Sequence, residues 1–158
     1  MKIKSAFFAG GSFWNLQEAF DAIDGVCFSI VGYMGGTTTY PDYNEVMNEH
    51  TGHVQALKVI YNQGIISYPE LVNRFFLLHN PTSFNRQGPD YGEQFRSIIF
   101  YQTEEERKTA ERIRDHYEKH NIYNAHILTQ IMKADTFYPA EENHQKFFEK
   151  HASYFGLN

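Results

Sequence analysis

Hydrophobic and polar residues follow two different spacings along this 158-residue chain. Short apolar or β-branched runs that close on glycine or turn residues predict strands, whereas apolar residues three or four positions apart predict helices. Residues 5–9 form a run of the first kind, and apolar residues from Phe13 to Ile23 then recur at helical spacing before Gly25. The predicted elements are strand 5–9, helix 13–24, strand 26–36, strand 54–61, helix 68–78, strand 97–101, a long helix from 104, strand 125–134 and a terminal helix over 139–156.

The sequence also marks the starts of two helices and contains two long loops. "SYPE" at 67–70 and "TEEE" at 103–106 are capping boxes, in which a Ser or Thr side chain caps the helix and a Glu three residues later reaches back. Residues 35–53 and 79–95 show no periodicity. Loops of that length in a compact domain are usually functional, so we expect site residues there.

The order of the elements predicts the fold class. A β-α-β-β-α-β series with a helix, a strand and a helix appended is the split βαβ pattern of an α+β protein. We therefore expect a two-layer sandwich with a ferredoxin-like core and a C-terminal extension, as one domain over residues 1–158. Many functions share such a fold, so the side chains have to indicate which one applies.

Composition excludes several classes of partner. A formal net charge of −5 disfavours nucleic acid, because phosphate binding needs clustered Lys and Arg. The N-terminal apolar run is far too short to span a membrane. Cys27 is the single cysteine, so neither an intramolecular disulfide nor a Cys-rich zinc site can form. These features are typical of a monomeric cytoplasmic protein.

Ser12 lies at the predicted N-terminus of the first helix, where free N–H groups stabilise an anion. A serine hydroxyl stays protonated there without a neighbouring base, whereas a cysteine would ionise more readily. From residue preferences alone, Ser12 is a helix cap and Phe13 and Trp14 are core residues. Alternation places Gln55 on the apolar face of strand 54–61, which is typical of a hydrogen-bonded buried amide.

Two other site classes fit poorly. His116 and His120 lie four residues apart, but the Glu between them is not at the His-Glu-x-x-His position, so we predict no metal site. "GGSFW" lacks the second glycine of the Gly-x-Ser-x-Gly elbow, and no motif marks a His/Asp pair as its partner. A serine hydrolase is therefore disfavoured.

Six motifs occur in the same order over residues 7 to about 148: "GGSFW", "GYMGG", "YNEV", "TGHVQA", "NRQGPDYGEQFRS" and "FYPAEENHQ". Together they resemble the peptide methionine sulfoxide reductase A family. This resemblance implies the reduction of methionine S-sulfoxide, free or in proteins, to methionine, as a repair of oxidative damage. It also implies no bound cofactor, and thioredoxin or a small dithiol as the external reductant.

The resemblance assigns site roles residue by residue. In the family, a cysteine thiolate attacks the sulfoxide sulfur, a buried glutamate supplies a proton, and the cysteine becomes a sulfenic acid. The implied positions are Ser12 for the cysteine, Phe13 and Trp14 for the methyl-binding aromatic pair, Gln55 for the glutamate, Tyr43 and Phe95 for the two tyrosines that hold the sulfoxide oxygen, and Asp90 for the pocket aspartate. No role is assigned within "FYPAEENHQ".

Three of these positions depart from the family pattern. Ser12 lacks the thiol, Gln55 lacks the acidic proton and Phe95 lacks the hydroxyl, while each nearly keeps the size of the residue it replaces. We therefore expect this chain to be inactive or strongly impaired, either as an engineered form or as a natural one. The alternative is a pseudoenzyme that binds oxidised methionine in partner proteins. Cys27 is expected to be a buried structural thiol, the alternative being a resolving partner for a cysteine restored at position 12.

Overall fold

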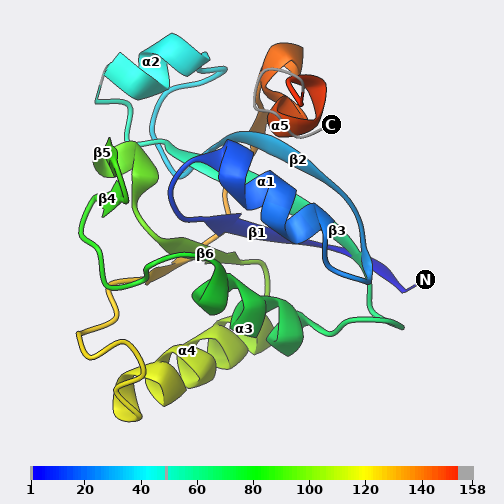
Figure 1. Cartoon of the computed structure of the whole chain (residues 1–158), viewed down its shortest axis with the longest axis vertical. Helices are drawn as coiled ribbons and strands as arrows, with labels where there is room; N and C mark the ends of the chain where they lie inside the picture. The colour runs from blue at the N-terminus through cyan, green and yellow to red at the C-terminus, as the bar shows by residue number, and fades with distance from the viewer. Residues whose placement is uncertain (1, 49, 153–158) are drawn as a thin grey trace.

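The computed structural model describes residues 2–48 and 50–152, and its centre is a six-stranded sheet in the order β7-β6-β1-β3-β2-β8 (Figure 1). The elements are β1 (Ile3–Ala9), α1 (Phe13–Asp21), β2 (Val26–Met34), α2 (Tyr43–Asn48), β3 (Val54–Asn62), α3 (Tyr68–Leu78), β4 (Arg86–Gln87), β5 (Asp90–Tyr91), a 3₁₀ turn (Glu93–Phe95), β6 (Ile98–Tyr101), α4 (Glu104–Lys119), β7 (Gln130–Lys133), β8 (Tyr138–Pro139), a second 3₁₀ turn (Glu142–His144) and α5 (Phe147–Lys150).

The sheet has the predicted split βαβ topology. β1 pairs antiparallel with both β3 and β6, and β3 pairs antiparallel with β2. β3 therefore separates β1 from β2, and β1 separates β3 from β6. The α+β, ferredoxin-like prediction is confirmed, and β7 and β8 extend the sheet at its two edges as the C-terminal addition.

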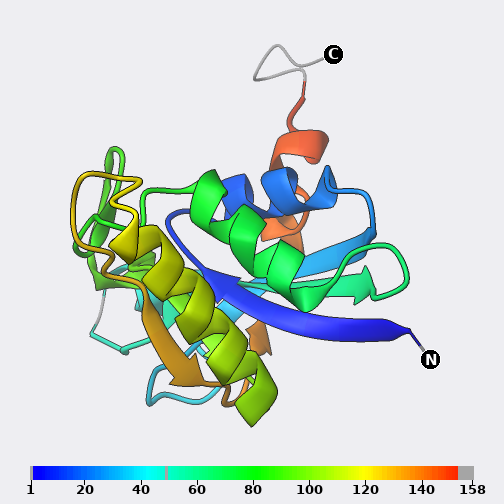
Figure 2. The same ribbon diagram turned by 90° about the horizontal axis from the view of Figure 1, so that it is seen from below.

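The main core lies between the sheet and the layer formed by α1, α3 and α4 (Figure 2). Leu57 and Val59 of β3 point into it, whereas Ala56 faces the opposite side, as period-two alternation predicts. Each fully buried aliphatic or aromatic side chain contributes about 1.5–3 kcal/mol. On the opposite face, Met132, Ala134 and Phe137 pack against a second, smaller cluster that includes Ala56.

Two predicted loops contain short elements. Residues 35–53 include α2, and residues 79–95 include the β4–β5 hairpin and a 3₁₀ turn. These elements are too short to show hydrophobic periodicity, which needs a window of 11–18 residues. The capping box at Ser67 is confirmed, because its hydroxyl accepts from Glu70 N–H while the Glu70 carboxylate accepts from Ser67 N–H. No helix in the described part of the chain is long and apolar enough to cross a bilayer.

The C-terminal prediction was wrong in its extent. The strand expected over 125–134 is confined to β7, and the helix expected over 139–156 is replaced by β8, a 3₁₀ turn and α5, with 153–156 outside the described residues. The physical reason is a long-range contact of Gln145. Its Oε1 accepts from Val31 N–H at 3.0 Å and its Nε2 donates to Val31 C=O at 2.9 Å. The Gln145 side chain thus forms the two hydrogen bonds to β2 that a neighbouring strand would form. These bonds keep the backbone around Gln145 from continuing as a helix.

Cys27 is exposed, so the expectation of a buried thiol was wrong. Val26 pairs with Tyr61 and Phe28 with Ile60, so Cys27 is the extra residue of a β-bulge, which redirects its side chain. The alternative role as a resolving partner also fails. Cys27 lies beside Tyr61 of β3, whereas the start of α1 contacts Gln55 of the same strand. Six residues separate Tyr61 from Gln55, or about 20 Å at the rise of an extended strand. That distance is far beyond disulfide reach.

Candidate active site

Gln55 connects the start of α1 to α2. It is 2% exposed, and its Oε1 accepts from Phe13 N–H at 3.0 Å, one of the helix N–H groups that lack an intrahelical partner. This bond turns Nε2 toward α2, where it donates to Met47 Sδ at 3.2 Å. The Gln55 side chain also lies close enough to Tyr43 to affect the pKa of its hydroxyl. The prediction of a hydrogen-bonded buried amide is confirmed.

Ser12 caps α1, as residue preferences predicted. Its Oγ accepts from Trp14 N–H at 3.2 Å, and its φ and ψ of −62° and 128° are those of an N-cap. Among the described residues, no imidazole or carboxylate hydrogen-bonds the Ser12 hydroxyl. The hydroxyl therefore stays protonated, and the geometry provides no serine-histidine pair for acyl transfer.

The entry to α1 runs close against the β4–β5 hairpin. Gly11 has a φ of +80°, and a Cβ there would lie 2.8 Å from Cβ of Gln87. Gly11 N–H donates to Phe95 C=O at 3.0 Å, which ties the following 3₁₀ turn to the same point. A cavity of about 260 Å³ opens here and is lined by Ser12 on one side and Asp90 on the other.

Phe13 and Trp14 differ in exposure. Phe13 is fully buried, as expected for a core residue, whereas Trp14 is half-buried and stacks on Tyr43 and on Phe147, at centroid separations of 6.1 and 3.9 Å. Trp14 lines a second cavity of about 250 Å³, together with Phe147 and Lys146. Ser12 and Trp14 thus face two cavities on either side of the α1 N-terminus, and neither cavity is lined by Gln55.

Burial is the main cause of the raised pKa of Tyr43. The nearby Gln55 amide lowers this pKa, and the Asp90 carboxylate raises it. Asp90 is therefore near enough to act on the same hydroxyl. Phe95 is 5% exposed and offers no hydroxyl at its position. The structure brings all the expected positions to the N-terminal end of α1. Ser12, Trp14 and Asp90 are partly exposed there. Phe13, Gln55 and Phe95 are buried.

Glu141 and His144, to which the sequence assigned no role, belong to the same site. The Glu141 carboxylate accepts from the Tyr33 hydroxyl at 2.8 Å and from Tyr43 N–H at 3.0 Å. Partial burial works to raise the pKa of Glu141, but these hydrogen bonds outweigh it and hold the pKa below its usual range. Burial and the bond to Glu141 raise the pKa of Tyr33, so this hydroxyl stays protonated.

His144 contacts both Tyr43 and Trp14. Its ring stacks on Tyr43 at 4.2 Å between centroids, and its Nδ1 accepts from Trp14 Nε1–H at 3.2 Å. Accepting this bond requires an unprotonated Nδ1. Burial, opposed by Glu141, lowers the pKa of His144 and favours that form. The only sequence signal for these roles was the motif "FYPAEENHQ" itself.

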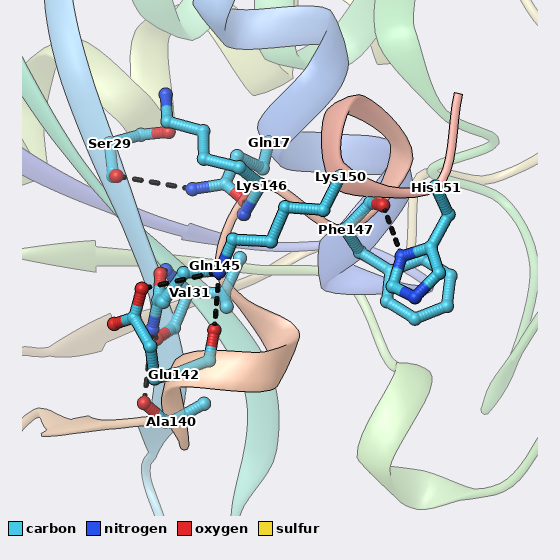
Figure 3. A network of polar contacts seen from close by, with 10 residues as sticks. All are labelled: Gln17, Ser29, Val31, Ala140, Glu142, Gln145, Lys146, Phe147, Lys150 and His151. Carbon is cyan, nitrogen blue, oxygen red and sulfur yellow. Dashed lines mark hydrogen bonds and ion pairs between the residues drawn. The ribbon is translucent and has the colours of Figure 1, made fainter. Parts of the chain in front are cut away.

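The segment that follows the motif is anchored by side-chain bonds to β2 and α1 (Figure 3). Besides the Gln145 pairing, the buried Gln17 of α1 accepts from Lys146 N–H at 2.6 Å and donates to Ser29 C=O at 3.1 Å. Lys146 Nζ also pairs with Asp21. These contacts fix the 3₁₀ turn, and with it Glu141 and His144, against the N-terminal half of the chain.

The described residues contain no group of three or more His, Cys, Asp or Glu side chains able to hold a metal ion. The fold and site together define a class of protein: a split βαβ sandwich with aromatic rings and a buried side-chain amide around one helix N-terminus. The family model of peptide methionine sulfoxide reductase matches residues 4–156. The chain belongs to this family of oxidoreductases, which confirms the resemblance carried by the six motifs.

Known relatives agree with this assignment. The chain is 42% identical over 148 residues to the peptide methionine sulfoxide reductase MsrA of Methanosarcina acetivorans, covering 94% of this chain and 79% of that protein. It is similar to the solved structure of methionine sulfoxide reductase A of Corynebacterium diphtheriae, with a TM-score of 0.90 and 28% identity over 96% of this chain and 76% of the other. It also resembles Mxr1 of Saccharomyces cerevisiae in complex with Trx2, with a TM-score of 0.66 and 26% identity over 90% and 84% of the two chains.

Proposed function

We propose that this chain binds methionine S-sulfoxide, free or in proteins, at the N-terminus of α1, and that its reductase chemistry is absent or strongly impaired. The observation that carries the proposal is the environment of Gln55. Its Nε2 is a buried donor whose partner is the Met47 thioether, and a thioether sulfur is a weak acceptor. A sulfoxide oxygen, which is a far stronger acceptor, would replace that sulfur at Gln55 and beside the Tyr43 hydroxyl.

The aromatic residues would hold the methyl end of the substrate. Trp14 is half-buried and stacks on Tyr43, and the buried Phe13 packs beside both rings. Apolar contact with such rings is favourable for a methyl group next to sulfur. His144 and Glu141 would act on binding by holding Trp14 and Tyr43 in position.

The expected loss of turnover follows from the chemistry of the replacing groups. Reduction transfers the sulfoxide oxygen to a thiolate, which is oxidised to sulfenic acid while the sulfoxide becomes a thioether. Ser12 has no thiolate, and serine oxygen has no counterpart of the sulfenic acid state. Gln55 can donate a hydrogen bond but cannot transfer a proton as a buried carboxyl could. Phe95 contributes no hydrogen bond to the oxygen.

The reductant depends on the residue at position 12. With Ser12 in place, thioredoxin or a small dithiol has no oxidised cysteine to reduce at this site. A Ser12→Cys variant would regain such a partner, in line with the yeast relative solved in complex with Trx2.

The second candidate is a pseudoenzyme that recognises oxidised methionine in partner proteins. One feature of the site favours it. The aromatic rings and the hydrogen bond between Gln55 and Phe13 are in place, whereas Ser12 and Gln55 stand where the family has a thiol and a carboxyl group. Binding of S-sulfoxide without turnover fits both candidates, and the Ser12→Cys variant separates them.

The test is a single-turnover assay with a methionine-S-sulfoxide peptide and no reductant, followed by mass spectrometry. The exposed Cys27 is replaced by Ser throughout, so that the only thiol is the introduced one. We expect one equivalent of methionine from Ser12→Cys and none from the parent chain or from Ser12→Ala. Turnover by the parent chain would refute the proposed impairment. No product from Ser12→Cys would show that Gln55 and Phe95 also block the reaction, which favours the pseudoenzyme.

A further inference from the structure

Met47 covers the amide that the proposed function assigns to the sulfoxide. Its Sδ lies 3.2 Å from Gln55 Nε2 and 3.9 Å from Gln94 Nε2. Both glutamines are buried, being 2% and 9% exposed. The chain thus places a methionine sulfur of its own against two buried side-chain donors at the position proposed for the oxidised methionine of a substrate.

The orientation of Gln55 makes this contact informative. Because its Oε1 is held by Phe13 N–H, the amide cannot flip, and Nε2 must face Met47. A weak acceptor offsets little of the free energy that a buried N–H donor loses when it leaves water. The site around Met47 Sδ is therefore better matched to an oxygen bound to that sulfur than to the thioether itself.

We propose that Met47 is an oxidation site whose sulfoxide is held by Gln55 and Gln94, so that the oxidised chain occupies its own sulfoxide site and excludes external ligands. The step requires a peroxide. The Met47 sulfur attacks one peroxide oxygen, the O–O bond breaks, the sulfur is oxidised by two electrons to the sulfoxide, and the other oxygen leaves as water.

Two features make the oxidised form accessible and lasting. Met47 is half-buried on the short helix α2, and its unbranched side chain can shift to make room for the added oxygen. Ser12 provides no thiolate to remove that oxygen again. The persistence of the Met47 sulfoxide and its competition with external sulfoxide rest on the proposed function. The hydrogen bonds from Gln55 and Gln94 to the Met47 sulfoxide oxygen do not.

The experiment treats the full chain, carrying Cys27→Ser, with hydrogen peroxide and maps methionine oxidation by peptide mass spectrometry. The affinity for N-acetyl-methionine-S-sulfoxide amide is then measured by titration calorimetry. We expect Met47 to be oxidised and the affinity to fall at least tenfold. Met47→Leu should keep its affinity after peroxide, whereas the matched control Met132→Leu, altered on the opposite face of the sheet, should lose affinity as the parent does.

A second measurement separates this inference from the proposed function. Side-chain NH₂ resonances of Gln55 and Gln94 should shift downfield when the parent is oxidised, and stay unchanged in peroxide-treated Met47→Leu. Unshifted amides in a chain oxidised at Met47, or a chain that peroxide leaves unoxidised at Met47, would overturn the inference. An untreated chain that fails to bind the sulfoxide ligand would refute the proposed function alone, because the amide shifts do not depend on external binding.

Discussion

Trp14 Nε1–H donates to His144 Nδ1 at 3.2 Å, which joins the first turn of α1 to a 3₁₀ turn 130 residues later in the chain. The bond exists only while Nδ1 is unprotonated, and burial keeps the pKa of His144 below its ordinary value. It makes the position of the indole depend on the protonation state of one buried imidazole.

We therefore expect acid to change the environment of Trp14, the only tryptophan, before the chain unfolds. Above the ordinary histidine pKa of about 6.5, His144 is neutral and the bond is intact. As the pH falls through the lowered folded pKa, protonation removes the acceptor. Trp14 fluorescence should show this step in the parent and lose it in His144→Gln. A step of equal size in His144→Gln would mean that another group is responsible.

Trp14→Ala should weaken the binding of a methionine-S-sulfoxide peptide by more than about 1 kcal/mol, through lost apolar contact. Titration calorimetry measures this directly. Phe148→Ala, which alters a neighbouring wall of the second cavity, serves as the control and should have a smaller effect. An unchanged affinity in Trp14→Ala would place the binding site elsewhere.

Glu141→Gln should lower sulfoxide affinity more than Glu142→Gln. The Glu141 carboxylate accepts from both Tyr33 and Tyr43, and an amide keeps only one accepting oxygen. Glu142 is the matched neighbour, and its carboxylate pairs with Lys150 instead. Comparable affinities for the two variants would show that the Glu141 bonds do not position the Tyr43 side chain.

His79 should make stability fall in mild acid. Its imidazole is half-buried against Gly10 and bonded to Phe75 C=O and Ser97 Oγ, and desolvation lowers its pKa to about 4. Between the ordinary value of about 6.5 and this folded value, only the unfolded chain takes up the proton. The stabilisation is complete above pH 6.5 and declines by about 1.4 kcal/mol per pH unit as the pH falls toward 4.

Urea unfolding at pH 7 and at pH 5 measures this slope. His79→Asn should be less stable at both pH values, because it loses the ring hydrogen bonds to Phe75 and Ser97, but its stability should vary less between them. A parent chain whose free energy of unfolding is the same at both pH values would contradict the assignment of a neutral, half-buried His79.

Gly11→Ala should destabilise the chain more than Gly88→Ala. Both residues have a positive φ, +80° and +56°, so both substitutions incur the cost of a left-handed backbone, about 1 kcal/mol. Only at Gly11 would the new Cβ meet another atom, Cβ of Gln87 at 2.8 Å, since nothing lies within 4 Å at Gly88. Thermal unfolding of the two variants compares them, and equal melting temperatures would show that the hairpin moves away freely.

Local sequence signals determined the core of the fold and the identity of the family. Alternation in β3 placed Leu57 and Val59 on one face and Ala56 on the other, and Ser12 and Ser67 cap helices as their positions indicated. These features depend on residues within a few positions of one another, where backbone geometry and hydrophobic period act directly. The co-linear motifs predicted the family in the same way, since each is a short segment.

Only the tertiary structure decided the contacts that complete the site. Gln145 takes the place of a strand beside Val31, Glu141 reaches Tyr33, and Met47 lies against Gln55. The partners in the first two pairs are 114 and 108 residues apart, so no local periodicity records them. The bulge at Cys27 is equally invisible in a strand-like run, because it appears only when β2 is paired with β3. Side-chain hydrogen bonds between distant segments override local propensity, and here they hold the segment around Glu141 and Gln145, the aromatic rings and the buried amide in place.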